Sequence, residues 1–187
     1  YYCEWGILFK TSVKTSEKTI TINGKDTFKY EEIEKIKWNK IEDNNKLFMN
    51  IQFVSKNRVI PILLNPDSET VYDRLKEILW RGAGTLILER YLKELSLKKK
   101  IIIGNITLYD YGIELIDKGF IFSTTRMFTW KDIKDVNIID GYLEIKGPEN
   151  YQLSAKIDSE YNIYVIYVLL KLFFKNGNGI RISSLNE

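Results

Sequence analysis

The segment Phe28-Lys29-Tyr30-Glu31-Glu32-Ile33 recurs later in the chain as Phe128-Thr129-Trp130-Lys131-Asp132-Ile133. Both copies follow one pattern: phenylalanine, any residue, an aromatic, a charged residue, an acid and isoleucine. A second pair of segments, Glu4-Trp5-Gly6-Ile7 and Asp110-Tyr111-Gly112-Ile113, shares an acid, an aromatic, glycine and isoleucine. Two matched segments in the same order predict an internal repeat.

The parts that follow the shared segment also agree in order. In both copies two strand-like stretches come next, then an acidic helix start, then a helix: residues 47–54, 58–64 and 67–69 in the first copy, and 142–146, 151–157 and 158–160 in the second. The alternative is that β-rich sequences resemble one another by composition. The common order of parts favours a repeat.

The repeat predicts a mostly β, α+β chain of two tandem domains, each closed by a C-terminal helix. Residues 1–82 form domain 1, 83–99 a helical linker, 100–176 domain 2 and 177–187 a tail. Residues 100–107 give domain 2 an opening strand with no counterpart in domain 1. We expect the corresponding strand of domain 1 to lie upstream of residue 1 or to be absent.

Local signals place turns and helices within these domains. Asn23-Gly24 is typical of a tight β-hairpin, and residues 11–18 are expected to form a polar loop. Val71, Leu75, Ile78 and Leu79 predict the buried stripe of the first helix. The glycines of Gly82-Ala83-Gly84 are expected to break that helix, and without a following Lys-Ser/Thr they do not make a phosphate loop.

The final helix, residues 160–175, is apolar on nearly every side. Such a helix is buried on more than one face. It can pack on its own sheet and a neighbouring domain, or present one face to a partner. The second alternative makes Tyr164, Tyr167 and Phe174 candidate partner-facing residues.

Composition excludes several chemistries. The chain of 187 residues has no histidine, which removes the commonest general base and metal ligand and excludes Ser-His-Asp and Cys-His sites. One cysteine, Cys3, makes neither an internal disulfide nor a zinc site. Adjacent acids such as Glu31-Glu32 and Glu42-Asp43 fall in turns, where they point into solvent. We expect no enzyme, no metal and no cofactor.

Charge points to a mild electrostatic role. The net charge is +3, with both signs interleaved, so we expect no nucleic-acid partner. Lys98-Lys99-Lys100 is the one run of three like charges. It could contact anionic lipid headgroups, at about 1 kcal/mol per lysine near a charged surface. The alternative is a solvated linker.

The order of short strands, aromatic turn and closing helix resembles bacterial pleckstrin-homology-like (PH-like) domains of uncharacterised function. The matching elements in the second copy are Tyr111-Gly112-Ile113, Trp130-Lys131-Asp132-Ile133 and the helix from Glu160. The first copy offers Trp5-Gly6-Ile7, Tyr30-Glu31-Glu32-Ile33 and the helix from Ser68. The resemblance implies two tandem bent β-sheet barrels, each capped by a helix.

The resemblance also implies a binding module without catalysis. Such bacterial proteins often carry membrane-spanning helices before the domains, which implies a module on the cytoplasmic side, anchored through a segment upstream of residue 1. Many PH domains bind phosphoinositides through a basic loop between their first two strands, but no basic cluster stands near Tyr111 or Lys118. The partner is therefore expected to be an anionic membrane surface or an unidentified protein, the latter making the chain a soluble adaptor.

Overall fold

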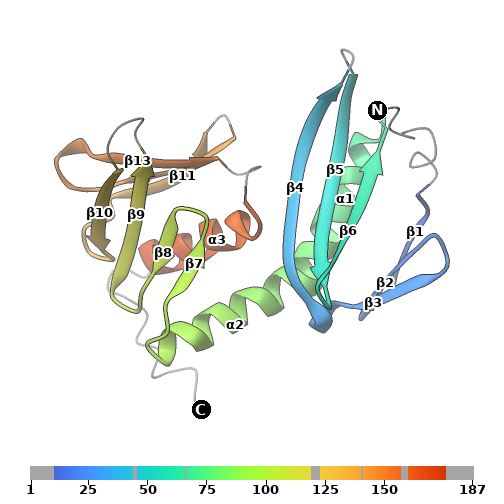
Figure 1. Cartoon of the computed structure of the whole chain (residues 1–187), viewed down its shortest axis with the longest axis horizontal. Helices are drawn as coiled ribbons and strands as arrows, with labels where there is room; N and C mark the ends of the chain where they lie inside the picture. The colour runs from blue at the N-terminus through green and yellow to red at the C-terminus, as the bar shows by residue number, and fades with distance from the viewer. Residues whose placement is uncertain are drawn as a thin grey trace. The chain divides into compact units, whose positions relative to one another are not determined.

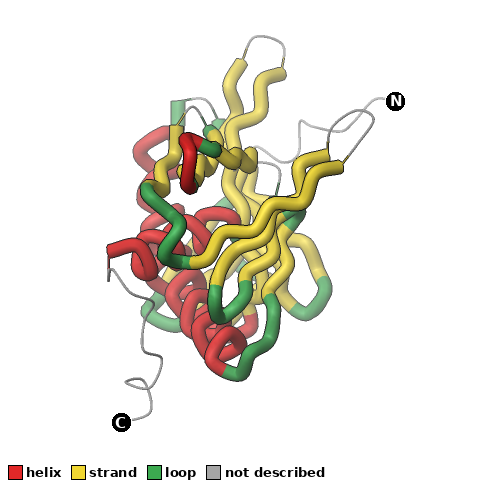
Figure 2. The backbone as a smooth tube through the Cα atoms, turned by 90° about the vertical axis from the view of Figure 1, so that its left-hand side faces the viewer, coloured by secondary structure: helices red, strands yellow, loops and turns green. Residues whose placement is uncertain are grey.

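The computed structural model describes residues 11–43, 46–65, 67–118, 123–139, 141–156 and 160–175. The chain divides into two compact units, Tyr1–Ile87 (unit 1) and Leu88–Glu187 (unit 2). Strands make up most of the regular structure, as several small antiparallel sheets accompanied by helices (Figures 1 and 2).

Unit 1 contains two three-stranded sheets. The first consists of β1 (Val13–Thr15), β2 (Thr19–Ile22) and β3 (Asp26–Lys29). A single 3₁₀ turn, η2 (Tyr30–Glu32), leads to the second sheet of β4 (Ile33–Asp43), β5 (Lys46–Ser55) and β6 (Arg58–Leu64). The chain then continues through α1 (Glu69–Leu79), the π-helical turn η3 (Trp80–Gly84) and the start of α2 (Thr85–Ser96).

Unit 2 has a four-stranded sheet followed by a three-stranded one. The four-stranded sheet consists of β7 (Ile101–Ile103), β8 (Ile106–Leu108), β9 (Gly112–Lys118) and β10 (Ser123–Thr129). The three-stranded sheet consists of β11 (Asp135–Ile139), β12 (Tyr142–Lys146) and β13 (Gln152–Lys156). A short turn, η4 (Pro148–Asn150), precedes β13, and the helix α3 (Ile163–Lys175) follows it.

The expected bent β-sheet barrels are not closed barrels in the described part of the chain. In each unit the described strands form two separate sheets, with no backbone ladder that closes them into a barrel. Side chains join the sheets instead: the Phe28 ring of β3 meets the Phe53 ring of β5 edge to face, with centroids 5.2 Å apart. In unit 2 one core takes side chains from both sheets, α3 and the end of α2.

The shared segment occupies the same place in both units. Ile20 pairs with Phe28 across the β2–β3 hairpin, and Ile113 pairs with Phe128 across β9–β10. All four side chains are buried. The β2–β3 pair of unit 1 therefore corresponds to the β9–β10 pair of unit 2. Gly112 therefore corresponds to Thr19 rather than to Gly6, which lies outside the described residues.

The aromatic residue two positions after the shared phenylalanine makes an equivalent backbone hydrogen bond in both units. The amide of Tyr30 donates to the carbonyl of Lys18 at 3.0 Å, and the amide of Trp130 donates to the carbonyl of Tyr111 at 3.2 Å. Lys18 and Tyr111 each immediately precede the strand that pairs with β3 or β10. Tyr30 and Trp130 are therefore structurally equivalent.

Some predicted local features are confirmed and others are wrong. Asn23 and Gly24 adopt positive φ angles of 53° and 67°, as the predicted hairpin requires. The predicted polar loop at residues 11–18 is wrong in part, because β1 forms within it and pairs with β2. The Val-Lys-Thr sequence of β1 lacks the apolar alternation by which strands are recognised.

The helices of unit 1 also differ from expectation. Leu75 and Leu79 are buried as predicted, but Val71 is 51 % exposed and Tyr72 takes its place in the core. The buried stripe therefore runs through Tyr72, Leu75 and Leu79, three and four residues apart. The predicted break at Gly82-Ala83-Gly84 is wrong, because these residues form η3 and the helix continues into α2.

The closing helix α3 begins at Ile163, three residues later than predicted. Among its described side chains none is exposed, but the half-buried ones lie on one stripe, so the expected absence of a solvent face is confirmed only in part. These residues are Tyr164, Tyr167, Val168, Lys171 and Leu172. Leu88, Tyr91 and Leu92 of α2 pack against the same core. No helix in the described part of the chain is long and apolar enough to cross a membrane.

Candidate functional site

The predicted lysine run lies at the turn between α2 and β7, within unit 2. Lys98, Lys99 and Lys100 are all exposed, and within the described residues none forms an ion pair. Three ammonium groups therefore stand together without a neutralising partner.

A helix-ending motif fixes the backbone of this turn. The amide of Lys98 donates to the carbonyl of Leu95 at 2.9 Å, and the amide of Lys99 donates to the carbonyl of Glu94 at 3.0 Å. Lys98 adopts a φ of 56°, the left-handed conformation that glycine usually supplies at this place. The chain thus holds a lysine where backbone preference favours glycine.

Two aliphatic side chains flank the lysines. Leu97 is 59 % exposed and Ile102 is 61 % exposed, more than any other large apolar side chain in the described part of the chain. Ile101 and Ile103 point into the core while Ile102 points away, as alternation along a strand requires. We call residues 97–102 the lysine turn. It presents cations and apolar surface together.

The structure places the predicted partner-facing residues on α3. Tyr164 and Tyr167 are half-buried, and their ring centroids lie 5.7 Å apart. Tyr167 packs against the unit 2 core, and the Lys171 ammonium lies 5.8 Å from its ring centroid. The Phe174 side chain lies outside the described residues. The two tyrosine rings contact each other, and each is partly buried within the protein.

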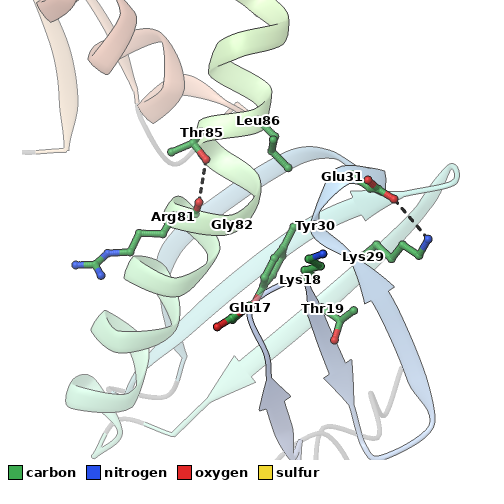
Figure 3. Close-up of a pocket in the computed structure, with 10 residues that line it drawn as sticks. All are labelled: Glu17, Lys18, Thr19, Lys29, Tyr30, Glu31, Arg81, Gly82, Thr85 and Leu86. Atoms are coloured by element: carbon green, nitrogen blue, oxygen red, sulfur yellow. Dashed lines mark hydrogen bonds and ion pairs between the residues drawn. The ribbon is translucent and has the colours of Figure 1, made fainter.

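Unit 1 contains a pocket that no sequence motif predicts (Figure 3). Its volume is about 580 Å³, within the usual range of small-molecule sites. The β1–β2 turn, the β3–η2 junction and the η3–α2 helix form its walls. Its lining residues are Glu17, Lys18, Thr19, Lys29, Tyr30, Glu31, Arg81, Gly82, Thr85 and Leu86.

The charged groups of the pocket differ in their partners. Lys29 pairs with Glu31 at 3.5 Å, and Arg81 pairs with Glu77 on the preceding turn of the helix. The Arg81 side chain points away from Tyr30 (Figure 3). Lys18 has no ion-pair partner within the described residues. The Lys18 ammonium is therefore the lining cation that could pair with an anionic group of a ligand.

Tyr30 forms the inner wall of the pocket. The residue is 4 % exposed, and its hydroxyl is buried without a hydrogen-bond partner in the described residues. Burial raises the pKa of this phenol. A side-chain carbon on Gly82 would come within 2.5 Å of the Tyr30 ring. The ring therefore packs directly on the backbone of the π-helical turn, a feature found often at functional sites.

The turn acids are held by structural contacts. A hydrogen bond from Lys56, 3.0 Å away, lowers the pKa of Glu32. The hydroxyl and amide of Thr129 donate to Asp132 at 2.8 and 2.9 Å, and they lower the pKa of that carboxyl. Within the described ranges no group of three His, Cys, Asp or Glu residues could hold a metal ion. The side chains of Glu42 and Asp43 lie outside those ranges.

Comparison with known proteins adds no identification. No protein-family model matches the chain, and no curated protein matches it. The candidate functional features of the chain are therefore the lysine turn, α3 and the unit 1 pocket.

Proposed function

We propose that the chain is a non-catalytic tandem PH-like binding module whose second unit contacts an anionic membrane surface. The order of elements in unit 2 supports the PH-like part: four strands, then three strands, then a closing helix. Unit 1 has three strands, three strands and a helix within its described residues. The lysine turn supports the proposed membrane contact.

The lysine turn combines two weak attractions. Three lysines near an anionic surface contribute about 1 kcal/mol each. Full burial of an aliphatic side chain such as Leu97 or Ile102 contributes about 1.5–3 kcal/mol. Stable membrane attachment usually requires two signals, and this turn offers both within six residues. Lys98 also places a cation at a left-handed backbone position that glycine would adopt more easily, and such strained positions cluster at functional sites.

The proposal places the module at the cytoplasmic leaflet, because that leaflet carries the anionic lipids. A membrane anchor upstream of residue 1 would increase the local concentration of lipid at the lysine turn. With such an anchor, even a moderate affinity of the lysine turn for anionic lipid would be enough to hold the turn at the membrane.

Co-sedimentation with liposomes tests this proposal. The protein is mixed with phosphatidylcholine vesicles, with or without phosphatidylserine, at low and high salt. We expect salt-sensitive binding to the anionic vesicles that is largely lost when Lys98, Lys99 and Lys100 are all changed to alanine.

A matched variant controls for net charge. Lys14, Lys25 and Lys131 are exposed and lie outside the lysine turn. Changing these three to alanine removes the same charge, and we expect this variant to keep its binding. Equal loss in both variants, or no binding by the unaltered protein, would overturn the proposal.

A protein-binding adaptor is the second candidate function. Ile139 and Tyr142 pair near the tip of the β11–β12 hairpin and are both exposed, and the neighbouring Ile138 is exposed on the other face of the strand pair. Tyr164, Tyr167 and Phe174 are the helix residues that would extend such a contact. Failure of liposome binding together with specific capture of a cellular protein, lost in Ile139→Ser, would favour the adaptor.

A further inference from the structure

Tyr30 and Trp130 are equivalent, but their surroundings differ. In unit 2 the Trp130 indole stacks on the Phe173 ring of α3, with centroids 4.5 Å apart. Its N–H donates to the carbonyl of Asp110 at 2.8 Å. The aromatic side chain thus fills its site and its polar atom is satisfied.

Unit 1 leaves the corresponding site partly empty. Tyr30 is smaller than tryptophan, and it meets Gly82 on the helix instead of a phenylalanine. Its hydroxyl is buried with no hydrogen-bond partner among the described residues, and the Tyr30 residue lines the cavity of about 580 Å³. A buried polar group without a partner is uncommon and needs a physical reason.

We propose that this cavity binds a small organic anion that has one carboxylate or phosphate group on a flat apolar body. The Tyr30 ring and Leu86 supply apolar wall, and the close packing of that ring on Gly82 sets its place in the cavity. Lys18 supplies the charge for a single anionic group. A small movement of the Tyr30 ring would bring its hydroxyl to an acceptor on the ligand.

The acids of the cavity limit the charge of the ligand. Glu17 and Glu31 line the same space, so each further negative charge on a ligand would meet a carboxylate. A flat molecule with a single anionic group fits this arrangement better than a polyphosphate. This ligand site lies entirely within unit 1 and is separate from the lysine turn.

Titration of the ¹⁵N-labelled protein by NMR tests the proposal. The probes are phenyl phosphate and benzoate, which distinguish the two anionic groups, and phenol as the uncharged analogue. We expect saturable amide shifts at Tyr30, Gly82 and Leu86 with at least one anion and much weaker effects with phenol. Phenol binding as tightly as both anions would overturn the anionic class.

Two variants identify the cavity and a third controls for charge. Lys18→Ala should weaken anion binding about tenfold, since a charged hydrogen bond is lost. Tyr30→Trp, which introduces the residue type found at the equivalent position of unit 2, should fill the space and abolish the shifts while the rest of the spectrum keeps its folded dispersion. Lys14→Ala, an exposed lysine outside the lining, should bind as the unaltered protein does. Absence of saturable shifts with both anions, or unchanged affinity in Lys18→Ala, would overturn the proposal.

Discussion

The indole ring of Trp130 lies nearly parallel to the phenyl ring of Phe173, with centroids 4.5 Å and ring planes 21° apart. This stack joins the turn after β10 to the helix that closes unit 2. We expect Phe173→Ala, at a residue 4 % exposed, to lower the free energy of unfolding by about 3–5 kcal/mol. In the double variant with Trp130→Ala, the loss should be smaller than the sum of the single losses by about 0.5–1.5 kcal/mol. Urea unfolding measures all three, and strict additivity would show that the rings do not interact.

Gly112 is required by close packing at the start of β9. A side-chain carbon there would overlap the backbone carbonyl oxygen of Phe128 on the paired strand. We expect Gly112→Ala to lower the free energy of unfolding by about 1–3 kcal/mol, because backbone cannot move aside as a side chain can. Gly141 is the control: it has open space and a φ of 79°, which asparagine tolerates. Gly141→Asn should cost less than about 1 kcal/mol, from its left-handed φ alone, and an equal effect of both changes would contradict the packing argument.

Lys98→Gly should separate stability from binding. The left-handed φ of 56° is unfavourable for lysine and easy for glycine, so the variant should gain up to about 1 kcal/mol of stability. The same change removes one cation from the lysine turn and should weaken binding to anionic vesicles. Thermal unfolding and liposome co-sedimentation on one preparation measure the two effects. A variant that is no more stable would show that the cap does not strain the lysine.

The turn carboxyl of Asp132 should give the protein a component of acid sensitivity. Thr129 lowers the pKa of Asp132 from its ordinary value of 3.8, so the ionised form is favoured by folding. The resulting stability is fully present above pH 3.8 and is lost as the pH falls through the lowered value. The difference in unfolding free energy between the unaltered protein and Asp132→Ala should therefore be constant near neutral pH and narrow below pH 3.8.

The donor from Thr129 can be tested separately. Thr129→Val keeps the shape of the side chain and removes its hydroxyl, so the pKa of Asp132 should rise towards its ordinary value. An NMR titration of the carboxyl group measures this directly. An unchanged pKa would assign the shift to the Thr129 amide alone.

The sequence predicted those parts of the fold that depend on local chemistry. Asn23-Gly24 marks a hairpin because both residues tolerate positive φ. Glu31-Glu32 were predicted to fall in a turn, and they lie in the 3₁₀ turn η2. The choice of Tyr72 over Val71 for the core was not visible, because both residues are compatible with an apolar helix face and tertiary packing decides between them. The helix also continues through Gly82, which packs against Tyr30, a residue distant in sequence.

The candidate sites were visible to different extents. Three consecutive lysines stand out in any sequence, and the structure adds their lack of ion pairs within the described residues. The exposure of Ile102 was hidden because it sits in a run of three isoleucines that resembles a buried strand. The unit 1 pocket could not be found, since Lys18, Tyr30 and Gly82 belong to three segments that no sequence pattern joins.

The capped end of α2 has a kinetic consequence. Hydrogen bonds from Lys98 and Lys99 to the last turn of the helix hold the lysine turn in place before it meets any surface. Because the backbone of the turn is already ordered, only its side chains lose conformational freedom on association, and no folding step is needed. For the proposed membrane contact, exchange between solution and the surface should then be limited by diffusion and by the strength of a few side-chain contacts, which predicts short residence times.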